Sequence, residues 1–270
     1  MFKVKKINDE IVKPITLPQI NNETIKGYDL FPELYANIFI LGKKKSGKSS
    51  VIFKILKSCS NKKTHVVIFC STVHKDKNYI GIINYLKKHD ITCSTYTSIY
   101  DNGSNQLEQY ISSFQEPEDE DEVIVSKKHR LIKFDSDSSE EEYEYKPKKI
   151  APEYIFVFDD LSTELHDKAL SSLLKKNRHF KTKIIISSQY YNDLAKDARL
   201  QIDYLLAFPK IPNDKIETVY KDLDLSTDYN LFLSMYTTAT KDKYNFLYID
   251  VREEKYRLNF NREFLIDDNN

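Results

Sequence analysis

The chain has 270 residues, 40% hydrophobic and 30% charged, an ordinary composition for a globular protein of one large or two small domains. No stretch approaches the roughly 20 apolar residues of a membrane span, and the N-terminal sequence MFKVKKINDEIVK lacks the apolar run of a signal peptide. The three cysteines show no metal-ligand spacing, and two fall in or beside apolar runs. We therefore expect buried free thiols and a reducing, intracellular setting.

The formal net charge is zero, but the charges are segregated along the chain. Residues 116–145 contain twelve acids and four bases, a net charge of −8. Subtracting them from 41 charges of each sign leaves 37 bases and 29 acids, so the rest of the chain carries +8. A basic body suits a polyanionic partner such as nucleic acid, although a general lysine bias would give the same excess.

Apolar patterning predicts alternating strands and helices in the first half of the chain. Residues 1–36 are polar and are interpreted as an N-terminal arm with a short strand or turn. Beyond them, strands are expected at 37–41, 65–70 and 92–96, and helices at 49–59, 79–88 and 107–114.

The pattern breaks at residues 115–149, which contain the acidic runs EPEDEDE and DSDSSEEE around VIVSKKHRLIKF. Dense like charge and low hydrophobicity predict a disordered insertion, with room for a hairpin inside it. A charge run is usually solvated surface; the functional alternative is an acidic flap that competes with DNA for a basic channel.

The second half of the chain resumes the alternation. Strands are expected at 154–160, 183–188, 203–208, 245–251 and 256–260, and helices at 163–176, 214–223 and 227–237. This order predicts an α/β fold with a mostly parallel central sheet flanked by helices, a domain at 37–260 and a C-terminal tail at 261–270.

A phosphate-binding sequence follows the first apolar strand. It satisfies G-x-x-x-x-G-K-[ST] and consists of Gly42, Lys43, Lys44, Lys45, Ser46, Gly47, Lys48 and Ser49, with Ser50 next to it. In such a loop the glycines allow tight turns that point amides at phosphate. Lys48 would reach the β- and γ-phosphates, and the Ser49 hydroxyl would coordinate Mg²⁺. A strand before the loop and a helix after it are the context that the motif requires.

Two carboxylates end the strand YIFVFDD, at Asp159 and Asp160. After a phosphate loop, Asp159 is the candidate to support Mg²⁺ and Asp160 the candidate base that activates water. The alternative for Asp160 is an ordinary N-cap of the following helix.

Further candidates surround the strand KIIISSQ. Gln189 ends it and would lie near the γ-phosphate, unless it is an ordinary surface residue. Arg178, within NRHF, and Arg199 are candidates for an arginine finger, because the chain has only six arginines. His179, next to Arg178, is a candidate for contacting the nucleotide or the next subunit.

With these segments in order, the sequence resembles the poxvirus-type genome-packaging ATPases of the FtsK/HerA superfamily. FILGKKKSGKSS, YIFVFDDLS, NRHF…KIIISSQ and ARLQIDYLLAF carry the resemblance over about 37–260, and the acidic insertion departs from it. It implies a RecA-like P-loop core of the additional-strand type that hydrolyses ATP with Mg²⁺. It also implies a homo-oligomeric ring that threads double-stranded DNA into a capsid, with capsid or virion proteins as partners and the virion or the host-cell cytoplasm as location.

Carried over by position, the resemblance implies phosphate and metal contacts for Lys48, Ser49 and Asp159, and a polar sensor at Gln189. Two other functions stay open on the residues alone. One is a small nucleotide or nucleoside kinase, although the middle of this chain is acidic where such enzymes carry arginine-rich lids. The other is a nucleotide-regulated, non-catalytic scaffold of a virion.

Overall fold

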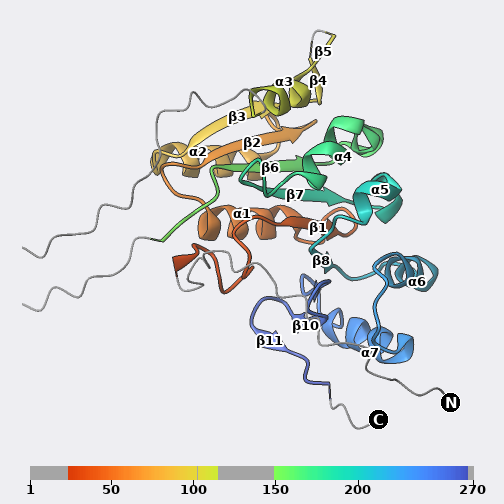
Figure 1. The fold of residues 1–270 in the computed structure, drawn as a ribbon. Coiled ribbons are helices and arrows are strands. Elements are labelled where there is room, and N and C mark those ends of the chain that lie inside the picture. The colour runs from red at the N-terminus through yellow and green to blue at the C-terminus, as the bar shows by residue number, and fades with distance from the viewer. Residues whose placement is uncertain (1–23, 102, 115–148, 267–270) are drawn as a thin grey trace, which may run out of the picture.

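The computed structural model describes residues 24–101, 103–114 and 149–266, and its main feature is one nine-stranded sheet (Figure 1). Its strands lie side by side in the order β11-β10-β9-β8-β1-β7-β6-β2-β3. They are β1 (Asn37–Leu41), β2 (His65–Cys70), β3 (Thr92–Tyr96), β6 (Tyr154–Asp159), β7 (Thr182–Ser188), β8 (Tyr204–Ala207), β9 (Leu247–Asp250), β10 (Lys255–Leu258) and β11 (Arg262–Glu263). The short strands β4 (Tyr100–Asp101) and β5 (Ser104–Asn105) pair separately.

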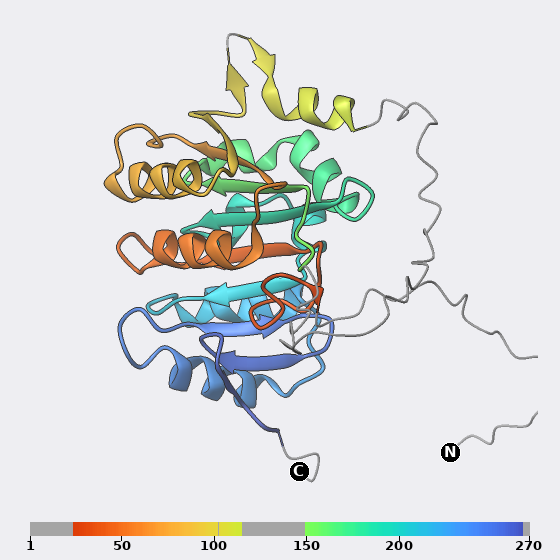
Figure 2. The ribbon, with the colours of Figure 1, turned by 90° about the vertical axis from the view of Figure 1, so that its left-hand side faces the viewer.

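The sheet is parallel from β8 to β3 and antiparallel from β8 to β11. This confirms the expectation of a mostly parallel sheet. Strand β7 lies between β1, which precedes the phosphate loop, and β6, which ends at Asp159, the first of the paired aspartates. The carboxyl ends of all these parallel strands meet at one edge of the sheet. Figure 2 shows the strands stacked one above another, with the C-terminal strands, in blue, at one end of the stack.

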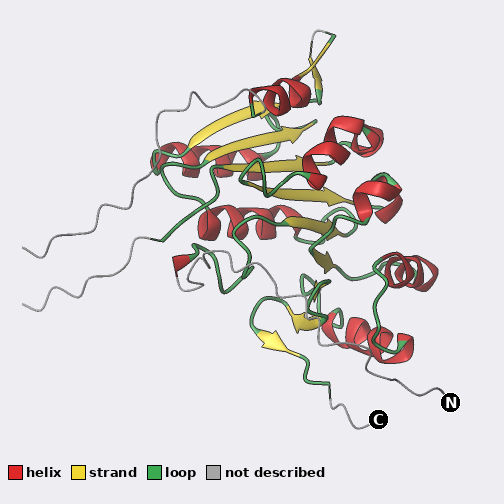
Figure 3. Cartoon of the chain, in the orientation of Figure 1, coloured by secondary structure: helices red, strands yellow, loops and turns green. Residues whose placement is uncertain are grey.

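Helices alternate with the strands, as Figure 3 shows in red and yellow. They are α1 (Lys48–Cys59), α2 (Lys77–Lys88), α3 (Gln106–Ser113), α4 (Lys168–Lys175), α5 (Lys196–Arg199), α6 (Asn213–Asp222) and α7 (Tyr229–Ala239). Two 3₁₀ helices, Ser162–His166 and Tyr191–Asp193, complete the described part of the chain.

Each face of the sheet packs against its own set of helices. Successive residues of a strand point to opposite faces, so Ile38 and Ile40 join one core and Phe39 and Leu41 the other. The first core contains the apolar faces of α1 and α2, and the second those of α3, α4, α6 and α7. Burial on both faces explains why the parallel strands read as continuous apolar runs.

The structure corrects the helix that was expected at 163–176. It is divided into the 3₁₀ helix Ser162–His166 and α4, because Asp167 between them has an extended backbone and accepts the amide of Ala169 at 2.7 Å. Asp167 also accepts the hydroxyl of Tyr100. Asp167 therefore ends the 3₁₀ helix and caps the start of α4. The apolar periodicity of the segment does not reveal this break.

The segment 24–36 contributes to the core. Leu30, Phe31 and Leu34 are buried, and the ring of Phe31 lies 5.0 Å from that of Tyr204. At the other end of the chain, β11 pairs with β10.

The predicted disorder and hairpin at 115–149 lie outside the described residues, except for the last position. All three cysteines are free, and Cys59 and Cys70 are buried. Within the described residues, no helix has the length and apolarity to cross a bilayer.

Candidate nucleotide-binding site

The loop from Gly42 to Gly47 joins the carboxyl end of β1 to the first turn of α1. The amide of Gly42 donates to the carbonyl of Ser188 at 3.1 Å, which fixes the loop's start to β7. Gly47 has φ 108°, in the left-handed region that favours glycine. No side chain caps α1, so its first amides and the positive end of its dipole face the loop, an arrangement that favours phosphate.

Gly42 is required by a close approach of side chains. A Cβ at this position would lie 2.7 Å from the Cβ of Phe208 and 2.8 Å from the Oγ of Ser46. Phe208 is fully buried and follows β8, so it has little freedom to withdraw. The first glycine of the motif therefore lets the loop pack against the neighbouring strand end.

The side chain of Lys48 turns back over the loop. Its Nζ donates to the carbonyl of Gly42 at 2.7 Å and to that of Lys43 at 3.4 Å. Burial lowers the pKa of Lys48, while the nearby carboxylates of Asp159 and Asp160 act to raise it. The ammonium thus lies between the loop and the carboxylates, where a β- or γ-phosphate would be contacted.

Asp159 is buried at the end of β6, and Tyr79 holds its carboxylate. The hydroxyl of Tyr79, on α2, donates to Oδ2 of Asp159 at 2.6 Å. Burial raises the pKa of Asp159, against the lowering effects of the Tyr79 hydrogen bond and the charge of Lys48. The carboxylate therefore has a fixed orientation toward the loop.

Asp160 is exposed and adopts φ 56°, in the left-handed region that Asp tolerates better than most residues. The Nε2 of Gln189 donates to its Oδ1 at 3.4 Å. The N-cap of the next helix is Leu161, with no side-chain capping bond, so the capping alternative for Asp160 is wrong. The structure thus brings the paired carboxylates and the strand-end amide together at the carboxyl ends of β6 and β7.

These groups line one pocket of about 610 Å³. Its lining contains every residue from Lys43 to Ser50, together with Asp159, Asp160 and Gln189. It also contains residues that sequence reasoning missed: Thr72, Asp76, Asn78, Lys243 and Tyr244.

A sequence signal exists for three of the missed residues only. Thr72, Asp76 and Asn78 follow β2, whose carboxyl end had to meet the same edge of a parallel sheet. Lys243 and Tyr244 precede the antiparallel strand β9, and no sequence pattern places them here.

The two candidate arginines lie outside this pocket. The Arg199 side chain is only 12% exposed, with Nε 3.3 Å from Asp222 and its guanidinium 5.0 Å from the ring centre of Tyr191. It also donates to Asn192. Arg178 is 61% exposed and lies 3.8 Å from Glu33. It precedes β7, at the amino edge of the parallel strands, with His179 exposed beside it.

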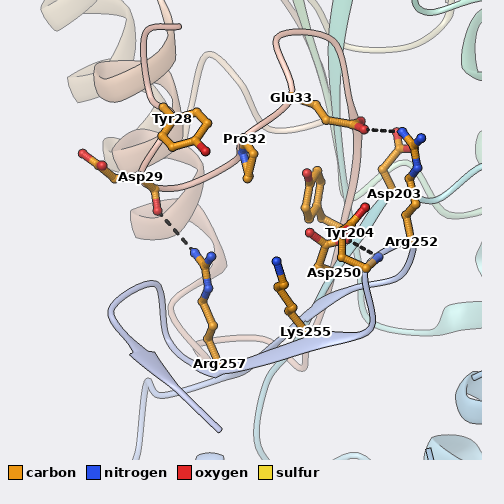
Figure 4. Close-up of a pocket in the computed structure, with 11 residues that line it drawn as sticks. Tyr28, Asp29, Pro32, Glu33, Asp203, Tyr204, Asp250, Arg252, Lys255 and Arg257 are labelled. Carbon is orange, nitrogen blue, oxygen red and sulfur yellow. Dashed lines mark hydrogen bonds and ion pairs between the residues drawn. The ribbon is translucent and has the colours of Figure 1, made fainter. Parts of the chain in front are cut away.

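A second pocket, of about 480 Å³, lies at that amino edge (Figure 4). Its charges are largely satisfied within the chain: Arg252 pairs with Glu33 at 3.0 Å, and Arg257 donates to the carbonyl of Asp29 at 3.4 Å. Burial raises the pKa of Asp203 to about 6. None of the phosphate-loop residues lines this pocket.

The residues at the loop fit a magnesium–nucleotide complex better than a protein-only metal site. No group of three or more His, Cys, Asp or Glu residues that could hold a metal occurs in the described ranges. Mg²⁺ binds through one or two protein oxygens plus substrate phosphates, and Ser49 and Asp159 supply such oxygens in one pocket. The Oγ of Ser46 is buried without a hydrogen-bond partner inside the loop.

The strand order β8-β1-β7-β6-β2, with the phosphate loop after β1 and the acidic pair after β6, defines the fold as that of a P-loop NTPase. Strand β7, inserted between them, is the additional strand of the RecA-like type.

Residues 127–255 match the model of a family described as "Poxvirus A32 protein". The match contains Asp159, Asp160 and Gln189 and leaves out the phosphate loop. It confirms the resemblance to the poxvirus-type family for this part of the chain. No curated protein sequence matches the chain.

Solved structures of viral packaging NTPases share the fold. The genome packaging NTPase B204 from Sulfolobus turreted icosahedral virus 2, in complex with sulfate, has a TM-score of 0.52 at 15% identity, covering 87% of this chain and 99% of that one. Its complex with AMP has a TM-score of 0.51 at 16% identity, covering 84% and 98%. The DNA-packaging ATPase B204 from Sulfolobus Turreted Icosahedral Virus has a TM-score of 0.50 at 15% identity, covering 83% and 96%.

Proposed function

We propose that this chain is an ATP-hydrolysing translocase that packages viral double-stranded DNA into a capsid. One observation carries the proposal: Lys48, Asp159, Asp160 and Gln189 line a single pocket around the phosphate loop. The family match and the fold of the packaging NTPases support the DNA-packaging part of it.

In the proposed reaction, the loop amides and the Lys48 ammonium bind the β- and γ-phosphates of ATP. Ser49 and Asp159 would hold Mg²⁺, which supplies charge neutralisation at the phosphate oxygens. Tyr79 keeps the Asp159 carboxylate oriented through its 2.6 Å hydrogen bond, so the geometry is set before the substrate binds.

Asp160 acts as the base for in-line attack of water on the γ-phosphorus. The carboxylate of Asp160 is exposed, which leaves room for a water molecule beside it. Gln189 donates to this carboxylate at 3.4 Å and orients it. Because Gln189 directly follows β7 and Asp160 directly follows β6, loss of the γ-phosphate would change a contact between the ends of these two strands.

The proposed assembly is a homo-oligomeric ring that works with capsid or virion proteins, in the virion or at the viral assembly site in the host cytoplasm. An arginine of the neighbouring subunit would complete each site. Arg178 is the better candidate, since it is exposed at the opposite edge of the sheet, whereas Arg199 is committed to Asp222 within its own subunit. The +8 charge outside residues 116–145 supports contact with the DNA backbone.

The test is an ATPase assay across protein concentration, with and without double-stranded DNA. We expect DNA to stimulate hydrolysis, with a steep rise at concentrations where rings form. Lys48→Ala should abolish it, while Lys54→Ala, which removes an exposed lysine of the same helix, should not. Full activity of Lys48→Ala would overturn the mechanism. Phosphate transfer to a small acceptor would favour the kinase alternative, and ATP binding without turnover would favour the scaffold.

A further inference from the structure

Tyr244 is an exposed aromatic residue beside the phosphate loop. It lies in the connection between α7 and β9, and 55% of its surface is accessible. It lines the same pocket as Ser49 and Ser50 at the start of α1. The phosphate chemistry described above uses the hydroxyl of Tyr79 but gives the Tyr244 ring no role.

The ring packs directly against the phosphate loop. A Cβ built on Gly47 would lie 3.3 Å from Cδ1 of Tyr244 and 3.8 Å from its Cβ. The second glycine of the motif thus accommodates both the turn of the loop and the close approach of this ring. Tyr244 is fixed at the point where the chain leaves the loop and enters α1.

The connection that carries Tyr244 is held in place by its neighbours. The amide of Phe246 donates to Oδ1 of Asn259 at 3.1 Å, and Nδ2 of Asn259 donates to Oδ1 of Asn245 at 2.9 Å. Tyr244 itself has φ 72°, an uncommon conformation for an aromatic residue. A strained residue that its surroundings hold in place is typical of functional positions.

One face of the ring already attracts a cation from its own chain. The Nζ of Lys243 lies 4.6 Å from the ring centre. Lys243 is exposed and its side chain is long and flexible, so a planar group can displace its ammonium from the ring.

We propose that Tyr244 is the stacking platform for the base of the bound nucleotide, with Lys243 displaced toward the phosphates when the base arrives. The inference rests on the proposed function, in that it takes the triphosphate to lie in the loop. Aromatic side chains stack on every base because every base has a π-face, so this site binds a nucleoside triphosphate through its base without reading it by hydrogen bonds.

The test compares ATP with inorganic tripolyphosphate, which has the phosphates but no base. Dissociation constants of both, with Mg²⁺, are measured by titration calorimetry on the full chain, for the wild type and for Tyr244→Phe and Tyr244→Leu. We expect Tyr244→Leu to weaken ATP about tenfold, the loss typical of one base–aromatic stack, and to leave tripolyphosphate unchanged. Tyr244→Phe, which keeps the ring, should bind both as the wild type does.

Tyr100→Leu is the matched control, because Tyr100 is 53% exposed and lies on β4, outside the pocket. Unchanged ATP affinity in Tyr244→Leu would overturn the proposal, and so would an equal loss for ATP and tripolyphosphate, which would mean a damaged loop. A wild-type chain that binds ATP more tightly than tripolyphosphate yet hydrolyses none with DNA would refute the proposed function and leave the base platform standing.

Discussion

The hydroxyl of Tyr79 donates to Oδ2 of Asp159 at 2.6 Å, and this buried hydrogen bond links α2 to the end of β6. It orients the carboxylate that would support the metal, from a helix that carries no residue of the phosphate loop. Burial raises the pKa of both groups, Tyr79 well above the ordinary value of tyrosine, so tyrosine stays a donor at neutral pH.

Tyr79→Phe removes this bond and keeps the ring. We expect kcat for ATP hydrolysis to fall about 10- to 100-fold, with weaker Mg²⁺ dependence of binding, because partners of metal ligands usually have effects of that size. Tyr85→Phe is the control, since Tyr85 lies on the same helix and its hydroxyl makes no hydrogen bond within the described residues. Equal rates for Tyr79→Phe and the wild type across Mg²⁺ concentrations would contradict the role.

Asp160→Asn tests the base. It should lower kcat by about 10²- to 10⁴-fold and leave ATP affinity nearly unchanged, because the amide keeps the size of the side chain but cannot take a proton. Gln189→Ala, which removes the partner at 3.4 Å, should cost less. Single-turnover hydrolysis and equilibrium ATP binding separate the two effects. A loss of binding in Asp160→Asn would show instead that the carboxylate holds the substrate complex.

The two arginines should behave differently on substitution. Arg199→Ala breaks a nearly buried pair with Asp222 and should lower the free energy of unfolding by about 2–3 kcal/mol. Arg178→Ala, at an exposed site, should change stability by no more than about 0.5 kcal/mol and yet reduce hydrolysis in assembled rings. For each variant, urea unfolding measures the stability and an ATPase assay measures the hydrolysis. Mixing Arg178→Ala with Lys48→Ala subunits should restore part of the activity, and no restoration would exclude action across the subunit boundary.

Gly42→Ala and Gly81→Ala should have opposite effects on stability. The first places a Cβ 2.7 Å from that of Phe208 and should cost about 1–3 kcal/mol and weaken ATP binding. Gly81 is exposed within α2, and a Cβ there meets nothing within 4 Å, so alanine should stabilise the chain by about 0.5–1 kcal/mol. Thermal unfolding and ATP titration provide the measurement. If Gly42→Ala changed neither stability nor ATP affinity, Phe208, which follows β8, would have to move away from the loop.

The raised pKa of Asp203 should make the stability of the chain depend on pH. Its pKa is raised from 3.8 to about 6 by burial, and Glu33 acts in the same direction, against Arg178 and Lys183. A raised carboxyl pKa favours the protonated folded state, so the contribution of Asp203 to the free energy of unfolding is largest below pH 4 and is lost as pH rises through 6.

Asp203→Asn removes this loss and keeps the acceptor for the amide of Asn37, which Oδ2 binds at 2.7 Å. At pH 7 the variant should be more stable by about 1–3 kcal/mol, and its stability should vary less between pH 4 and 7. Urea unfolding at both pH values, with exposed Asp224→Asn as the control, gives the comparison. An unchanged pH profile in Asp203→Asn would show that another group is responsible.

Local sequence pattern was enough to predict the parallel sheet and the phosphate loop with its candidate acidic partners. Strands such as NIFIL, HVVIFC and YIFVFDD are buried on both faces, so their apolar runs mark them with the bounds that β1, β2 and nearly β6 have. The loop sequence and Asp159, Asp160 and Gln189 follow such runs, and parallel strands bring their carboxyl ends together. These features depend on local pattern and on one rule of sheet geometry.

The packing of whole elements brings groups that are distant in sequence to the candidate site. Tyr79 reaches Asp159, Tyr244 reaches Gly47, and Arg199 pairs with Asp222 because of how helices and antiparallel strands pack around the sheet. A side chain on a helix or a connecting loop shows in its own sequence neither its partner nor its distance from it. Such contacts follow from the way whole elements pack. An apolar periodicity predicts that a helix or strand exists, but it does not predict where that element lies relative to the others.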